Sequence, residues 1–104
     1  MRTKLIMALV DESLTAAVLE SARTLGCLDV IVIGPAQGAG ALPAKTFLEM
    51  NLLGRRDVVL LLAWATDSPA LARMVAEVAG LGHGPGRGRV FLLAVEDIVG
   101  LPEG

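Results

Sequence analysis

The sequence of 104 residues contains one cysteine, one histidine and no tyrosine. The single cysteine, Cys27, excludes an intramolecular disulfide and any zinc site built from several cysteines. The single histidine, His83, argues against a catalytic metal centre made by this chain alone, so we expect no metal site. Only Phe47, Trp64 and Phe91 are aromatic, which leaves few side chains on which the bases of a single-stranded nucleic acid could stack.

The chain also lacks a basic cluster, a long apolar run and an N-terminal targeting signal. Its formal net charge is −2, so we expect no nucleic-acid partner. The longest apolar run, residues 58–65, is far shorter than the roughly 20 residues that cross a bilayer. The first 14 residues contain no small-residue cleavage site and are typical of a first strand rather than a signal peptide. We therefore expect a cytoplasmic protein.

The composition predicts a folded core. Apolar residues make up 54% of the sequence and charged residues 19%, whereas disorder requires low hydrophobicity and high net charge. The length suits one domain, residues 1–104, and no repeat or change of composition divides it.

Apolar runs typical of strands alternate with helical periodicity in the order β-α-β-β-α-β. Asp11 stands at the N-cap of the first helix and Gly26 at its end, while Asp67 or Ser68 caps the second helix, with Pro69 at the first helical position. The expected strands span residues 4–10, 29–34, 55–65 and 89–95, and the expected helices span about 12–25, in about four turns, and 69–79.

This order predicts an α+β fold, the ferredoxin-like βαββαβ sandwich, in which two helices cover one face of a four-stranded antiparallel sheet. Strands in such a sheet usually alternate apolar and polar residues, because one face meets solvent. The runs LIMALV, VIVI, VVLLLAWA and VFLLAV do not alternate, so both faces are apolar. No third helix is available for the second face, and we expect another copy of the chain to cover it.

Two glycine-rich segments are candidate binding elements. Residues 80–88 (GLGHGPGRG) have glycine at every second position and are followed by Arg89. Consecutive free backbone N–H groups can bind an anion, and an arginine beside them can hold a phosphate through two hydrogen bonds. A phosphate cradle and a merely glycine-rich connection both fit this composition. The second segment, residues 35–43, contains Gly38 and Gly40 and is expected at the same edge of the sheet.

No catalytic set can be assembled from the remaining polar residues. Glu96 and Asp97 are adjacent, so in a strand they point to opposite faces. His83 is typical of a solvated loop histidine, and Cys27 of a small packed residue. We therefore expect no catalytic residues and no enzymatic activity.

The sequence resembles the P-II nitrogen-regulatory superfamily over essentially its whole length. The resemblance rests on residues 40–47 (GALPAKTF), on the strand at 57–62, and above all on residues 86–97 (GRGRVFLLAVED), which are similar to the GxGxIFxxxVE ending of that family. The segment PAKTF and the GLP ending resemble the P-II-like branch linked to inorganic-carbon handling more than the nitrogen-sensing members.

This resemblance implies a homotrimeric, non-enzymatic signalling protein that binds an adenine nucleotide (AMP, ADP or ATP) in clefts between subunits. It also implies that the long loop at about 39–54 docks on a target protein, such as a membrane transporter or an enzyme. The implied nucleotide-binding residues are Gly38, Ala39, Gly40, Gly86, Arg87, Gly88 and Arg89. The implied partner-binding residues are Leu42, Lys45, Phe47 and Met50.

Three departures from the family pattern modify these expectations. The absence of tyrosine excludes modification of a loop tyrosine, and Leu42 replaces the glutamine that holds magnesium and 2-oxoglutarate in some members. The C-terminal basic residues that contact polyphosphate in the family have no match, so ATP is expected to bind little more tightly than ADP or AMP.

The alternative function is that of an interaction or structural trimer of the same fold with no small-molecule ligand. An acylphosphatase-type enzyme is discounted, because residues 4–14 contain neither arginine nor asparagine.

Overall fold

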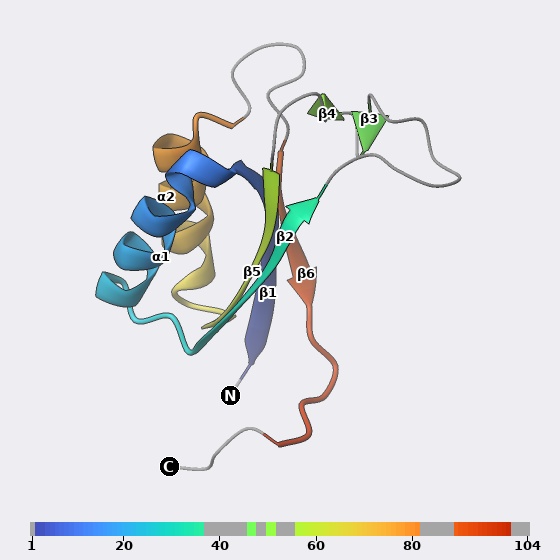
Figure 1. The fold of residues 1–104 in the computed structure, drawn as a ribbon. Helices are drawn as coiled ribbons and strands as arrows, with labels where there is room; N and C mark the ends of the chain where they lie inside the picture. The colour runs from blue at the N-terminus through green and yellow to red at the C-terminus, as the bar shows by residue number, and fades with distance from the viewer. Residues whose placement is uncertain (1, 37–45, 48–49, 52–55, 82–88, 101–104) are drawn as a thin grey trace.

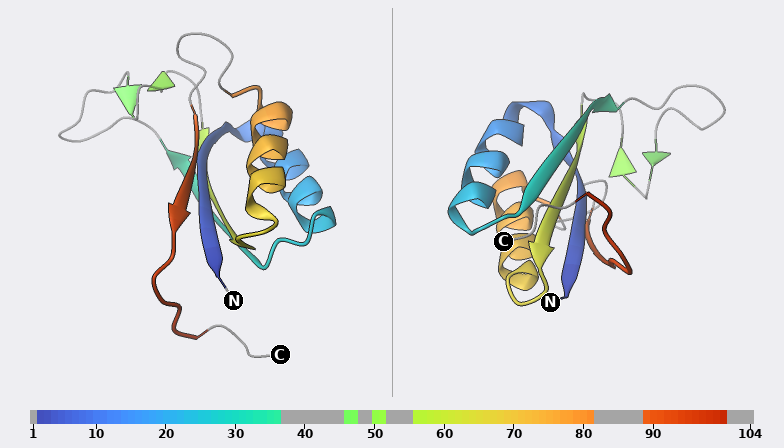
Figure 2. Two further views of the ribbon diagram at one scale, coloured as in Figure 1. Left: turned by 180° about the vertical axis from the view of Figure 1, so that it is seen from behind. Right: turned by 90° about the horizontal axis from the view of Figure 1, so that it is seen from below.

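The computed structural model describes residues 2–36, 46–47, 50–51, 56–81 and 89–100 (Figure 1). The main sheet has the strand order β2-β5-β1-β6 with every neighbouring pair antiparallel, and α1 and α2 lie on one face of it (Figures 1 and 2). The predicted ferredoxin-like sandwich is confirmed. Its elements are β1 (Thr3–Asp11), the 3-10 helix η1 (Glu12–Leu14), α1 (Thr15–Thr24), β2 (Asp29–Ala36), β3 (Thr46–Phe47), β4 (Met50–Asn51), β5 (Arg56–Trp64), α2 (Ser68–Ala79) and β6 (Val90–Ala94).

The first helix begins differently from the prediction. The Asp11 side chain accepts a hydrogen bond from the Ser13 N–H, so Asp11 is an N-cap as expected, but it caps the 3-10 turn η1 rather than α1. The side-chain cap reaches only two residues along the chain, which is typical of a tight turn. The expected helix of about four turns is therefore η1 followed by the ten residues of α1.

The second helix is close to its prediction. Asp67 is the N-cap residue, and Ser68 rather than Pro69 is the first helical residue. The Ser68 hydroxyl donates a hydrogen bond to the backbone oxygen of Ala65, 2.9 Å away. Gly80 ends the helix in the left-handed conformation with φ of 66°, as glycine at this position commonly does.

The core lies between the sheet and the helices. Alternate residues of the two central strands face α1 and α2 and are almost fully buried, in agreement with the period of two along a strand. They are Ile6, Ala8 and Val10 in β1 and Val59, Leu61 and Ala63 in β5, packed in one cluster with Val18, Ala22, Leu71 and Val75 of the helices.

The opposite face of the sheet is also apolar, as the sequence predicted. The registers place Met7 opposite both Leu60 and Phe91, and Ile31 opposite Leu60. We call this surface the outer face; no helix among the described residues covers it (Figure 2). Apart from Leu9, each of its residues is at least partly exposed. It consists of Leu5, Met7, Leu9, Ile31, Ile33, Val58, Leu60, Leu62, Phe91 and Leu93.

One small element was not predicted. Within the segment expected to be a loop, Thr46 pairs with Asn51 and Phe47 with Met50, so that β3 and β4 form a two-stranded antiparallel ribbon. This ribbon is separate from the main sheet (Figure 1). The segment at 39–54 thus contains backbone pairing of its own, although pairs of residues are too short to show periodicity in the sequence.

Candidate functional site

The ends of several elements meet at one end of the sheet. β1 ends there, β5 and β6 begin there, and β2 and α2 also end there (Figure 1). Both glycine-rich segments attach at this end, one after Ala36 and the other between Leu81 and Arg89. The predicted placement of the two segments at the same edge is confirmed for the residues that flank them.

Few of the predicted binding residues lie within the described part of the chain. Arg89 is exposed and directly precedes β6. Phe47 and Met50 are paired with each other in the ribbon of β3 and β4. The remaining candidates lie outside the described residues, namely Gly38, Ala39, Gly40, Leu42, Lys45, Gly86, Arg87 and Gly88.

A cavity of about 250 Å³ lies at this end of the sheet, lined by Asp11, Ser13, Leu14, Arg56, Ala79, Gly80 and Leu81. Its polar contacts centre on one carboxylate. Asp11 accepts hydrogen bonds from the Ser13 hydroxyl at 2.7 Å and the Ser13 N–H at 3.0 Å, and Arg56 Nη1 lies 3.7 Å from Asp11 Oδ2. The bonds from Ser13 hold the pKa of Asp11 below its usual range, and the Arg56 charge acts in the same direction. The cavity wall therefore combines a fixed carboxylate with a guanidinium.

A second carboxylate, that of Asp57, directly follows Arg56 in the sequence of β5. Asp57 Oδ2 accepts a hydrogen bond of 2.6 Å from Thr15 Oγ1, the hydroxyl of the first residue of α1. Sequence reasoning missed Asp57, Thr15 and Arg56. The sequence feature that could have indicated the two β5 residues is an arginine and an aspartate at the start of a strand that is otherwise wholly apolar.

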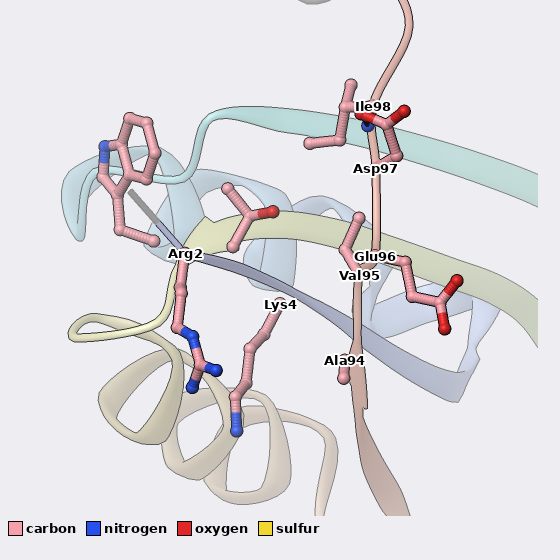
Figure 3. Close-up of a pocket in the computed structure, with 9 residues that line it drawn as sticks. Arg2, Lys4, Ala94, Val95, Glu96, Asp97 and Ile98 are labelled. Carbon is pink, nitrogen blue, oxygen red and sulfur yellow. Dashed lines mark hydrogen bonds between the residues drawn. The ribbon is translucent and has the colours of Figure 1, made fainter.

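A larger cavity, of about 760 Å³, lies at the opposite end of the sheet (Figure 3). Residues from the start of β1, the end of β5 and the segment after β6 line it. In Figure 3, Arg2 and Lys4 extend side by side, away from Asp97 and Ile98. Since this cavity lies at the end of the sheet opposite the residues that flank both glycine-rich segments, it is not part of the candidate nucleotide site. Its lining residues are Arg2, Thr3, Lys4, Trp64, Ala94, Val95, Glu96, Asp97 and Ile98.

The described part of the chain offers neither a cluster of metal ligands nor a helix that could span a membrane. Among those residues, no group of three or more His, Cys, Asp or Glu side chains is arranged to hold a metal ion. No helix within the described ranges is long and apolar enough to cross a membrane.

The chain has the fold of the P-II proteins. It is similar to CPII from Thiomonas intermedia K12 bound to ADP, AMP and acetate, with 13% identity, a TM-score of 0.66, and coverage of 90% of this chain and 86% of that one. It is equally similar to Arabidopsis thaliana PII bound to citrate, with 16% identity, a TM-score of 0.66, and coverage of 93% and 78%. A third structure, the B. subtilis GlnK complex with ATP, shares 13% identity with a TM-score of 0.64 and coverage of 90% and 82%.

At the level of sequence, no family model and no curated protein matches the chain.

Proposed function

We propose that this chain is a P-II-like regulatory protein that binds an adenine nucleotide between subunits of a homotrimer. In this proposal it regulates a target protein, such as a transporter or an enzyme, through the segment at 39–54. The observation that supports the proposal is that the described residues flanking both glycine-rich segments lie at one end of a P-II fold, since neighbours with that fold are bound to ADP and AMP, to ATP, and to citrate.

The outer face supports the trimer. An exposed apolar surface that spans all four strands is much larger than the isolated apolar residues of a monomer's surface, and such patches usually mark an interface. A second and third copy would cover Ile31, Ile33 and Leu93, which are 54%, 56% and 41% exposed in the single chain. Clefts between copies would then adjoin the end of the sheet that carries the glycine-rich segments.

The proposed ligand contacts combine backbone and side-chain donors. Gly38, Ala39 and Gly40 would form one wall of the cleft, and Gly86, Arg87, Gly88 and Arg89 the other. Glycine lets the backbone N–H groups approach phosphate closely, and the Arg89 guanidinium supplies charge-assisted hydrogen bonds. No catalytic step is required of any residue in this site.

Titration calorimetry with AMP, ADP and ATP at one ionic strength tests the proposal. Charge-assisted contacts contribute about 1.5–3 kcal/mol, so Arg89→Ala should weaken nucleotide binding by roughly 10- to 150-fold. Arg73→Ala is the matched control, because Arg73 is an exposed arginine on α2. Equal affinities of wild type and Arg89→Ala would remove Arg89 from the site. Absence of binding to all three nucleotides would favour the ligand-free interaction trimer.

A further inference from the structure

The carboxylate of Asp57 touches two other elements. One oxygen, Oδ2, accepts the 2.6 Å hydrogen bond from Thr15 Oγ1, and Thr15 is only 8% exposed. The other side of the carboxylate lies against Gly34 of β2. A Cβ added to Gly34 would lie 2.8 Å from Asp57 Cγ and closer still to Oδ1. The carboxylate therefore occupies space that only a glycine at position 34 leaves open.

Gly34 lies at an irregularity of the sheet. Ile33 pairs with Val58 and Ala36 with Arg56, so Gly34 and Pro35 together stand opposite the single residue Asp57. This is the pattern of a β-bulge, which bends its strand and redirects the chain. The bulge lies directly before the end of β2.

Asp57 is thus next to both ends of the segment at 37–55. Ala36 is the last residue of β2 and Arg56 the first of β5, and the pair they form is the last of the ladder. Through Thr15, the same carboxylate is bonded to the first residue of α1. Three elements therefore meet at one charged group.

We propose that Asp57 is a positioning residue that fixes the direction in which the segment at 37–55 leaves the sheet. It does so by contact with the bulge at Gly34 and by the hydrogen bond that holds it to α1. The proposal deepens the proposed function, because Gly38 and Gly40 come shortly after the bulge in the sequence and the proposed partner-binding residues lie in the same segment. If the segment left the sheet in a different direction, the proposed first wall of the nucleotide cleft would move with it.

A purely stabilising contact would behave differently from a positioning one. Loss of a stabilising contact lowers the free energy of global unfolding and speeds exchange throughout the core, whereas loss of a positioning contact speeds only local opening. Amide hydrogen exchange separates the two, with residues 33, 34, 36 and 56–58 as the local probe, since Pro35 has no amide hydrogen, and Leu61, which is fully buried, as the core probe. This measurement needs no ligand.

Four variants make the exchange experiment decisive. Asp57→Ala and Thr15→Val each remove the charge-assisted bond and should speed exchange at the local probe by about tenfold or more, with Leu61 unchanged. Thr15→Ser keeps the hydroxyl and should restore slow exchange. Gly34→Ala should speed local exchange in the wild type but add little in the Asp57→Ala background, because the conflicting carboxylate is then gone.

The outcomes that overturn the proposal are distinct from those that overturn the proposed function. Unchanged local exchange in both Asp57→Ala and Thr15→Val would overturn it, as would equal acceleration at Leu61. Additive effects of Gly34→Ala and Asp57→Ala on local exchange would also overturn it.

If the wild type binds a nucleotide, Thr15→Val should weaken binding several-fold. Unchanged nucleotide affinity despite faster local exchange would contradict the positioning role of Asp57. Failure of the wild type to bind any nucleotide would refute the proposed function, while the exchange result still decides the role of Asp57.

Discussion

Met7 of β1 lies directly opposite Leu60 of β5, at the centre of a sheet face that no helix among the described residues covers. Both side chains are half-buried even in the single chain, because their neighbours on adjacent strands are apolar too. A charge at this position would have to be buried if copies of the chain pack face to face, and burial of an unpaired charge is strongly unfavourable.

Leu60→Asp should therefore dissociate the proposed trimer. Light scattering of the wild type should give about 32 kDa, three times the chain mass of 10.8 kDa, and the variant should give the mass of one chain. Ala17→Asp, on the exposed side of α1, is the control and should leave the mass at three chains. A wild type that is monomeric at micromolar concentration would contradict the role of the outer face.

The Asp11 cap should make stability depend on pH in the acid range. Its pKa is lowered in the folded chain, first by the Ser13 hydroxyl, then by the Ser13 N–H, with Arg56 adding to this. A lowered folded pKa means that the stabilisation is complete above the unfolded value near 4 and is lost as pH falls through the folded value. Urea unfolding between pH 5 and 3 should show this loss in the wild type and much less of it in Asp11→Asn. Parallel curves for the two proteins would exclude Asp11 as the source.

Cys27 should react slowly with alkylating reagents. Burial raises the pKa of its thiol above the usual value of 9.0, and Sγ lies 3.1 Å from the backbone oxygen of Asp29 and 3.4 Å from that of Leu62. Because the thiolate is the reactive form, iodoacetamide at pH 8 should modify the folded protein several-fold more slowly than the protein unfolded in urea. Equal rates in the two states would show that the thiol is accessible and unperturbed.

Gly80→Ala should destabilise the chain through the backbone alone. Gly80 has φ of 66°, and nothing lies within 4 Å of a Cβ built on it, so no steric contact contributes. The left-handed conformation costs a residue with a side chain about 1–2 kcal/mol, which urea unfolding at fixed protein concentration can measure. Gly80→Asn should cost less, because asparagine adopts this conformation more readily. A larger loss for asparagine than for alanine would contradict this explanation.

Much of the fold followed from local patterns in the sequence. The apolar runs located the four main strands, Gly26 and Gly80 marked the ends of the two helical regions, and the lack of alternation predicted an apolar outer face. These features depend on residues that are close in the sequence, which is why pattern reasoning could find them. The start of α1 was misplaced because a 3-10 turn and the first turn of an α-helix share the same capping residues.

The contacts at the candidate site were harder to predict. Asp57 bonds to Thr15, 42 residues away in the sequence, and fills the space over Gly34 only because a bulge brings β2 into that position. The sequence around Asp57 shows a polar residue at a strand start, which is common and specifies no partner. Similarly, the two-residue strands at Thr46–Phe47 and Met50–Asn51 are too short for periodicity to reveal them.

The pairing of Ala36 with Arg56 has a consequence for how proteins of this shape can diverge. With both ends of the intervening segment held in the ladder, the entropic cost of closing it grows slowly with its length, and each doubling of a flexible loop costs only about 0.6 kcal/mol. Insertions, deletions or whole exchanges between these two residues are therefore thermodynamically cheap. If the segment binds a target as proposed, its replacement can change the target while the buried layer between sheet and helices is inherited unchanged.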